Sequence, residues 1–186
     1  MNDSGNAEGI KIRRLSPEEF VRLAEVERKE RVRVGYRMSN GKLERMDVHW
    51  DSSNWRPEGP EHSGECFVHE LNKYHDRGST TLGAFDGDRL VAVATWRPNL
   101  TKTMDQLAFL HVSHGYRRRG IGSLLCDRLE ALARDNGAHT FYVSATPSES
   151  AVGFYMGRGF APTVTPHPEL FELEPEDIHM TKELAN

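Results

Sequence analysis

The sequence predicts a mixed α/β fold in a single domain, and three observations support this. Its 186 residues are enough for one ordinary domain with a buried core. Hairpin signals and strand–helix–strand runs follow one another along the chain, which indicates a mixed sheet covered by helices. No repeat, low-complexity tract or linker divides the sequence. Residues 1–9 are polar and are expected to be flexible, so the domain should span residues 10–186.

Composition argues against several classes of protein. Lys and Arg number 24 against 28 Asp and Glu, which gives a net charge of −4. An acidic surface disfavours nucleic-acid binding through bulk charge and a polybasic membrane anchor. No apolar run approaches the roughly 18–20 residues that span a bilayer, and the N-terminus lacks the pattern of a signal peptide. Cys66 and Cys126 stand far apart, so no disulfide framework is expected. We therefore expect a cytoplasmic protein without a nucleic-acid or membrane partner.

Two local signals organise the first third of the chain. Ser16, followed by Pro17 and Glu19, is typical of a helix N-terminus with a capping box, and the helix should reach about Arg28. Asn40-Gly41 between alternating apolar residues predicts a tight hairpin. The expected elements are a strand at 10–13, this helix, a hairpin within 31–50, a loop over 50–64 and a helix over 65–74.

Strands and helices alternate from residue 80 onward. A periodic apolar face predicts the longest helix, and Gly137 is placed to end it. A second capping-box pattern at residues 146–149 predicts the next helix. The expected elements are strands at 81–85 and 90–96 joined by a turn at 86–89, a strand at 107–112, a helix over 121–132, a strand at 140–145, a helix through 155, and strands at 160–164 and 178–183 around an acidic loop at 166–177.

The segment 107–122, LAFLHVSHGYRRRGIG, predicts an anion-binding turn. A buried strand runs into three arginines and then into Gly120-Ile121-Gly122 at the start of a helix. The first backbone N–H groups of a helix have no internal partner, and glycines let a phosphate reach them. The G-x-x-x-x-G-K-[ST] phosphate-loop pattern is absent. The dinucleotide pattern G-x-G-x-x-G also fails, because Leu125 stands in place of its third glycine.

Two motifs together resemble a known family. Arg117-x-x-Gly120-x-Gly122 resembles the pyrophosphate-binding signature of the GNAT superfamily of acyl-CoA-dependent N-acyltransferases. Residues 154–160, FYMGRGF, resemble the family's aromatic-Tyr…Gly-Phe motif. Ser148 precedes this motif at an offset that is usual in the family. The resemblance covers residues 80–184 well and the start of the chain more loosely. It implies a central twisted mixed sheet, splayed at the fourth core strand and flanked by helices.

The resemblance also implies roles for particular residues. Tyr155 would act as general acid toward the departing CoA thiolate, although a core aromatic role is the alternative. The Val112 N–H would polarise the thioester carbonyl. The arginine side chains would contact the 3′-phosphate or point into solvent. The residues implied in cofactor binding are Leu110, His111, Val112, Arg117, Arg118, Arg119, Gly120, Ile121, Gly122, Ser123, Ser148 and Phe154.

The activity implied is acetyl transfer from acetyl-CoA to a primary amine, by direct attack in a ternary complex and without a metal. The general base stays unassigned. Gln106 and Ala108 occupy positions where relatives carry Glu or His, and a glutamine cannot act as a base. The remaining candidates are His111, His114, Glu149 and Asp105. A catalytically silent CoA-binding module for sensing or assembly is the alternative function.

Two further regions bear on metal binding and on the acceptor site. His69 and His75 lie six residues apart on a predicted helix, so they point away from each other and no metal site is expected. Residues 31–64 are expected to form a hairpin and loop insertion near the acceptor site. Its aromatic residues would supply an apolar wall and its carboxylates would attract a cationic amine, or it is an ordinary solvated hairpin. The acceptor is expected to be a small-molecule or peptide amine. A homodimer is a further expectation from the resemblance.

Overall fold

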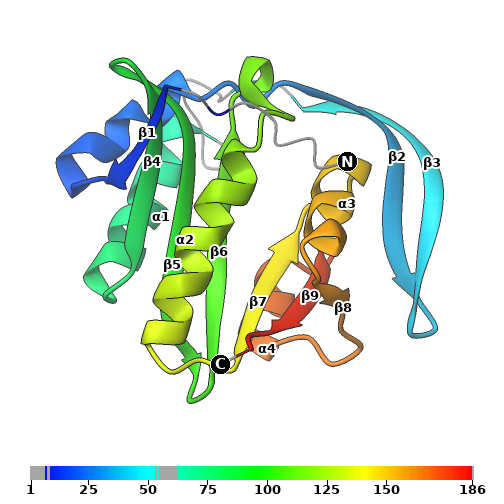
Figure 1. Ribbon diagram of the computed structural model, residues 1–186. Helices are drawn as coiled ribbons and strands as arrows, with labels where there is room; N and C mark the ends of the chain where they lie inside the picture. The colour runs from blue at the N-terminus through cyan, green and yellow to red at the C-terminus, as the bar shows by residue number, and fades with distance from the viewer. Residues whose placement is uncertain (1–6, 8, 53, 55–62, 186) are drawn as a thin grey trace.

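The computed structural model describes residues 7, 9–52, 54 and 63–185. The fold is a mixed sheet of seven strands in the order β1-β4-β5-β6-β7-β9-β8, with a separate two-stranded hairpin, β2–β3 (Figure 1). Only the β6–β7 pair is parallel within this sheet. The sheet strands are β1 (Ile10–Arg14), β4 (Thr80–Asp86), β5 (Arg89–Thr101), β6 (Met104–Val112), β7 (Thr140–Ala145), β8 (Ala161–Pro162) and β9 (Ile178–Glu183).

Helices cover both faces of the sheet and thereby enclose two apolar clusters. On one face α2 packs Leu125 and Leu129 over the small side chains Ala92 and Ala94 of β5. On the other face η1 and α1 close over a second cluster that includes Leu90. The helical elements are η1 (Pro17–Glu25, a 3-10 helix), α1 (Gly64–Asp76), η2 (His114–Tyr116), α2 (Ile121–Asp135), α3 (Glu149–Gly157) and α4 (Pro168–Leu173). No helix among these described residues is long and apolar enough to cross a membrane.

The sheet splits between β6 and β7. Their parallel pairing covers three residue pairs, from Met104↔Thr140 to Gln106↔Tyr142. Beyond Gln106, β6 stays paired with β5 as far as Val112↔Ala92 and has no partner on its other edge among the described strands. Figure 1 shows β7 and β9 diverging from β6 at this end. The predicted splay at the fourth core strand is therefore confirmed, and we call this opening the split.

The hairpin of β2 (Glu30–Ser39) and β3 (Lys42–Ser52) docks on the start of α3. Its turn uses the left-handed residues Asn40 and Gly41, with φ of 49° and 74°, as the Asn-Gly pattern predicts. The Tyr36 N–H donates to the Pro147 carbonyl at 3.0 Å. A Cβ on Gly35 would lie 3.1 Å from that carbonyl oxygen, so a glycine allows this close approach. The hairpin lies outside the main sheet, beyond α3 (Figure 1).

Several predicted boundaries differ from the structure. The capping box at Ser16 forms, but η1 ends at Glu25 because Val26 is already extended, so the prediction that it reaches Arg28 is wrong. The strand predicted at 160–164 shortens to Ala161–Pro162. The loop predicted at 166–177 contains α4, which begins with Pro168 at its first position. Part of the loop predicted at 50–64 lies outside the described residues.

Candidate active site

The predicted anion-binding turn follows β6 directly and opens α2. Arg118 and Gly120 both adopt left-handed backbone conformations, with φ of 59° and 79°. Alternation of left-handed and right-handed backbone conformations turns successive N–H groups toward one side, which creates a concave site for an anion. A left-handed arginine is strained by roughly 1 kcal/mol, and such strain is typical of functional loops. The turn therefore has the backbone geometry that a phosphate ligand requires.

Gly122 brings the turn, β6 and α3 together. A Cβ placed on Gly122 would lie 3.4 Å from the Phe154 ring and 3.6 Å from a Val112 methyl. Three residues predicted from separate motifs thus meet at the start of α2, beside the split. A side chain larger than a methyl at residue 122 would compete for this space with anything entering the split.

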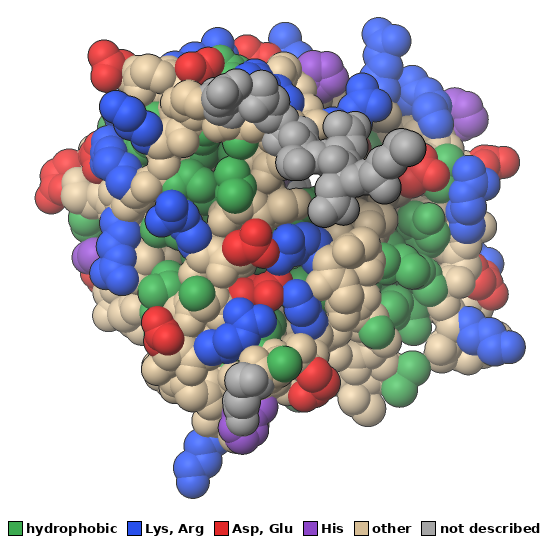
Figure 2. Space-filling model, in the orientation of Figure 1, with side chains coloured by type: hydrophobic (Ala, Val, Ile, Leu, Met, Phe, Trp, Pro, Cys, Tyr) green, Lys and Arg blue, Asp and Glu red, His purple; other side chains and the backbone are tan. Residues whose placement is uncertain are grey.

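The three arginines of the turn have different surroundings. The Arg117 guanidinium donates to Glu30 Oε2 at 2.9 Å and to the Val112 carbonyl at 3.2 Å. Arg119 lies over the Tyr116 ring, 5.0 Å from its centroid. Arg118 is exposed. Figure 2 shows basic and acidic side chains interspersed over this face of the molecule. The three consecutive arginines therefore supply the positive charge of the turn itself.

Tyr155 is buried on α3, with 7% of its surface exposed. It packs edge-on against Phe154 and Phe160, with ring centroids 5.3 and 5.5 Å away. Burial raises its pKa well above 10, and the charges of Cys126 and Asp177 add to the shift. No side chain in the described part of the chain hydrogen-bonds its hydroxyl. Tyr155 therefore keeps its proton at neutral pH and has it available for a ligand.

Ser148 is placed as the N-cap of α3 and is almost fully buried. Its Oγ accepts from the Ala151 N–H at 3.3 Å and lies 3.1 Å from the Ser150 hydroxyl. Ser150 in turn donates to Glu30. The helix-start role of Ser148 is thus visible in the structure, while its predicted contact with the cofactor stays a prediction.

His111 contacts two aromatic rings. Its ring centroid lies 4.5 Å from that of Phe109 and 6.4 Å from that of Phe67. Burial, followed by the nearby charges of Arg28 and Arg117, lowers its pKa to about 3. His111 is therefore neutral at physiological pH and too weak a base to hold the proton of an amine.

The other candidates for the base are committed elsewhere or exposed. Asp105 is buried and accepts from Trp96 Nε1 at 2.9 Å and from the Asn99 N–H at 2.7 Å. Gln106, also buried, accepts from Arg97 at 3.3 Å. His114 and Glu149 are exposed. None of these residues combines partial burial with a free carboxylate.

Sequence reasoning missed two residues at this site. Glu30 begins β2, one residue before the predicted hairpin, and reaches both the turn and α3 through Arg117 and Ser150. Asp177 ends the predicted acidic loop, and its charge reaches Tyr155. Neither residue belongs to a local motif, so only the three-dimensional arrangement could have indicated them.

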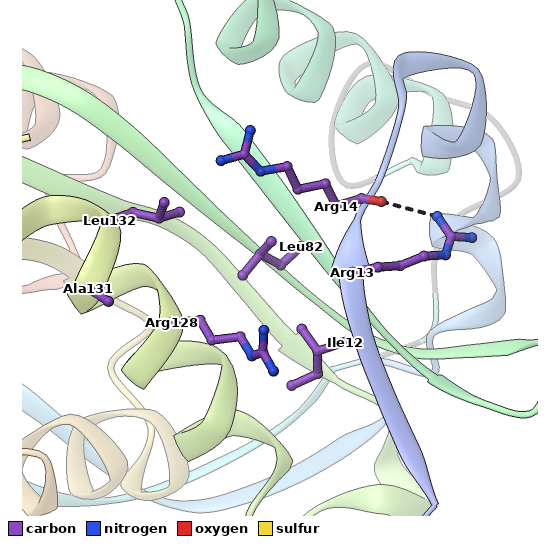
Figure 3. Close-up of a pocket in the computed structure, with 7 residues that line it drawn as sticks. All are labelled: Ile12, Arg13, Arg14, Leu82, Arg128, Ala131 and Leu132. Atoms are coloured by element: carbon purple, nitrogen blue, oxygen red, sulfur yellow. Dashed lines mark hydrogen bonds between the residues drawn. The ribbon is translucent and has the colours of Figure 1, made fainter. Parts of the chain in front are cut away.

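A separate cavity lies away from these residues. It has a volume of about 260 Å³ and is open to solvent between β1, β4 and α2 (Figure 3). Arg13 at its rim is turned toward η1, where it pairs with Glu19 at 2.6 Å. None of the predicted site residues lines this cavity; those that do are Ile12, Arg13, Arg14, Leu82, Arg128, Ala131 and Leu132. Across the described residues, no group of His, Cys, Asp or Glu side chains is arranged to hold a metal ion.

The split sheet, the glycine turn and the buried tyrosine define an acyltransferase of the type the motifs predicted. The model of the acetyltransferase (GNAT) family matches residues 47–160, more than half of the chain. The chain therefore belongs to this family of acyltransferase enzymes. The matched region includes the turn and Tyr155. A comparison with curated protein sequences found no match.

Solved structures show the same fold at low sequence identity. Nourseothricin acetyltransferase aligns with a TM-score of 0.72 and 15% identity, over 96% of this chain and 100% of that one. A putative streptothricin acetyltransferase from Bacillus anthracis, in complex with acetyl coenzyme A, gives 0.72 and 14% over 96% and 100%. PaiA N-acetyltransferase from Thermoplasma acidophilum, in complex with coenzyme A, gives 0.63 and 19% over 95% and 99%.

Proposed function

We propose that this enzyme transfers the acetyl group of acetyl-CoA to a primary amine, by direct attack in a ternary complex. The observation that carries the proposal is the position of the split. It opens where β6 leads into the anion-binding turn, and Tyr155 belongs to the core that α2 and α3 form beside it. A phosphate site, a slot lined by backbone and a proton donor thus occur in the order that a long thioester cosubstrate needs.

The residues present fit acetyl-CoA. The left-handed conformations at Arg118 and Gly120 and the first amides of α2 offer N–H groups to the pyrophosphate. The edge of β6 that faces the split is unpaired after Gln106 among the described strands, so backbone groups of residues 110–112 can pair with the pantetheine arm. Two of the structures with this fold contain CoA or acetyl-CoA, which supports the same assignment.

The chain's own groups then supply three functions. The Val112 N–H is the candidate donor to the thioester carbonyl, where negative charge develops during attack. Tyr155 protonates the departing thiolate, because burial preserves its proton at neutral pH. The α2 dipole and the turn hold the anionic end of the cosubstrate. The acceptor is a small-molecule or peptide amine.

Calorimetry with acetyl-CoA tests the cosubstrate assignment. The wild type should bind in the micromolar range, and Gly122→Leu should weaken binding at least tenfold, since its side chain would occupy the space beside Phe154 and Val112. Gly157→Leu is the matched control, because an added Cβ there meets nothing within 4 Å. Gly122→Ser, whose side chain is also larger than a methyl, serves if the leucine variant does not fold. Absence of binding by the wild type, or unchanged binding by a folded Gly122→Leu, would refute the assignment.

A screen of primary amines tests the transfer itself. Release of free CoA thiol that depends on an added amine, with formation of the acetylated amine, is the expected result. Binding of acetyl-CoA without turnover of any amine would instead support the catalytically silent CoA-binding module.

A further inference from the structure

Asp177 lies past the carboxyl end of β7, at the end of the sheet where β6 and β7 are no longer paired. It immediately precedes β9, whose first residue, Ile178, pairs with Ala145, the last residue of β7. Asp177 is therefore located past the carboxyl end of β7, where β6 has already separated from it. Its N–H donates to the Glu174 carbonyl at 3.2 Å and closes the turn that leads from α4 into β9. The fold thus fixes a carboxylate-bearing residue next to the end of β7 at which the split is open.

The Asp177 carboxylate is half-buried without a cation beside it. Among the described residues, no side chain or backbone group donates a hydrogen bond to it and no ion pair includes it. Glu130, in contrast, is buried and receives hydrogen bonds from Arg158 and Lys182 at 3.0 and 2.7 Å. Partly burying a carboxylate without a partner costs free energy, and such groups are characteristic of functional sites.

Two titratable groups lie close enough to Asp177 to interact with it electrostatically. They are Glu174, which follows α4, and Tyr155 on α3. Burial, followed by the charge of Glu174, raises the pKa of Asp177 from 3.8 to about 7. Near neutral pH this carboxylate can both accept and release a proton, which is the behaviour that general-base catalysis needs. Tyr155 keeps its own proton under the same conditions, so the two groups differ in the way an acid and a base must.

We propose that Asp177 is the general base that deprotonates the acceptor amine, an inference that rests on the proposed acetyl transfer. The acceptor arrives as an alkylammonium ion and gives one proton to the Asp177 carboxylate. The freed nitrogen lone pair attacks the thioester carbonyl carbon, so that the C–N bond forms and the C–S bond breaks. Tyr155 gives its proton to the sulfur. The second proton lost by nitrogen restores Tyr155, and Asp177 releases its proton to solvent.

The test compares two nucleophiles with Asp177→Asn. The first is the fastest alkylamine found in the amine screen, which is protonated at neutral pH. The second is hydroxylamine, whose conjugate acid is so much more acidic that it needs no base at that pH. We expect kcat/KM for the alkylamine to fall by about 10²–10⁴-fold in Asp177→Asn, with a much smaller change for hydroxylamine. The rise of wild-type kcat/KM through about pH 7 should disappear in the variant.

Two controls separate this role from a structural one. Glu176→Gln changes an exposed carboxylate one residue away and should leave both reactions unchanged. Asp177→Glu should recover part of the alkylamine rate. Wild-type alkylamine rates in Asp177→Asn, or equal losses for both nucleophiles, would overturn the proposal while leaving the acetyl transfer intact. If the wild type acetylates no amine, the proposed function itself fails, and calorimetry with acetyl-CoA shows whether the cofactor assignment survives.

Discussion

The Arg117 guanidinium bridges the Glu30 carboxylate, 2.9 Å away, and the Val112 carbonyl, 3.2 Å away. Glu30 begins the hairpin and Val112 ends β6, so one side chain ties the hairpin to the backbone beside the split. Glu30 also accepts a hydrogen bond from Ser150 at the start of α3. The hairpin is therefore part of the framework that holds the site, whatever its outer face binds.

A double-mutant cycle should detect this bridge. The side chains of Arg117 and Glu30 are 28% and 23% exposed, so their interaction is only partly screened by water. We expect Glu30→Ala and Arg117→Ala to be non-additive in urea denaturation by about 1 kcal/mol. The Arg37–Glu44 pair, with side chains 61% and 43% exposed, is the control and should give a coupling near zero. Additive effects at Glu30 and Arg117 would show that the contact contributes nothing.

Tyr155→Phe should separate binding from chemistry. The described residues provide no hydrogen-bond partner for the hydroxyl, so its removal leaves no other buried group unsatisfied and the fold should remain intact. Acetyl-CoA affinity by calorimetry should be unchanged, while kcat for thiol release should fall by about 10²–10⁴-fold. Turnover at the wild-type rate would exclude Tyr155 as the acid.

Asp177→Asn should stabilise the protein at alkaline pH. The folded-state pKa of Asp177 is raised from 3.8 to about 7, so the folded state binds the proton more tightly than the unfolded state does. Its contribution to stability is therefore present below about pH 4 and is lost as the pH rises to 7. Thermal unfolding should give a higher Tm for the variant than for the wild type above pH 7, with the difference shrinking in acid. A lower Tm at pH 8 would contradict the raised pKa.

Glu130 should control stability in acid. It joins α2 to the end of α3 and to β9 through Arg158 and Lys182. Burial alone would raise its pKa, but hydrogen bonds from Lys182 and Arg158 outweigh this and lower the pKa below 4.5. Its stabilisation is thus present above pH 4.5 and is lost as the pH falls through the lowered value. Glu130→Gln should cost about 3 kcal/mol at neutral pH and much less in acid, as measured by urea denaturation.

The two cysteines should differ in reactivity. Burial raises the pKa of Cys126 to about 12, and this residue lies on the buried face of α2. Cys66 is half-buried in the first turn of α1. A thiol reagent should modify one cysteine in the native protein and the second only after denaturation. Cys66→Ser should abolish the native reaction, and labelling of Cys126 in the folded protein would contradict the packing.

Local patterns were enough to predict most of the fold. The Asn40-Gly41 turn, the capping box at Ser16 and the apolar period of α2 each depend on neighbours in sequence, and all three form. The failures have tertiary causes. Helix α4 has six residues, too few for a period, and its buried Leu170 packs on Tyr142, which lies elsewhere in the chain. The helix predicted to reach Arg28 ends before Val26, because Val26 is extended and is buried against the sheet.

The candidate site also contains residues that could be predicted from the sequence and residues that could not. The turn and Tyr155 could be singled out because each belongs to a contiguous motif. The structure adds that Gly122, Val112 and Phe154 lie together. Glu30 and Asp177 could not be predicted. Their surroundings are made by segments distant in sequence, and a carboxylate's pKa depends on burial and on neighbours that only the fold defines.

The three-pair junction between β6 and β7 also affects folding cooperativity. Among the described residues, the backbone link between the two halves of the sheet consists of these three pairs and of hydrogen bonds from the N–H groups of residues 139 and 140 to the Thr103 carbonyl. The Glu130–Lys182 ion pair between α2 and β9 adds a side-chain link, so that the two halves can unfold together. A cosubstrate that pairs with β6 inside the split would extend this junction. Binding of the cosubstrate would then stabilise the folded enzyme against local unfolding. The empty enzyme would be the form most readily attacked by proteases.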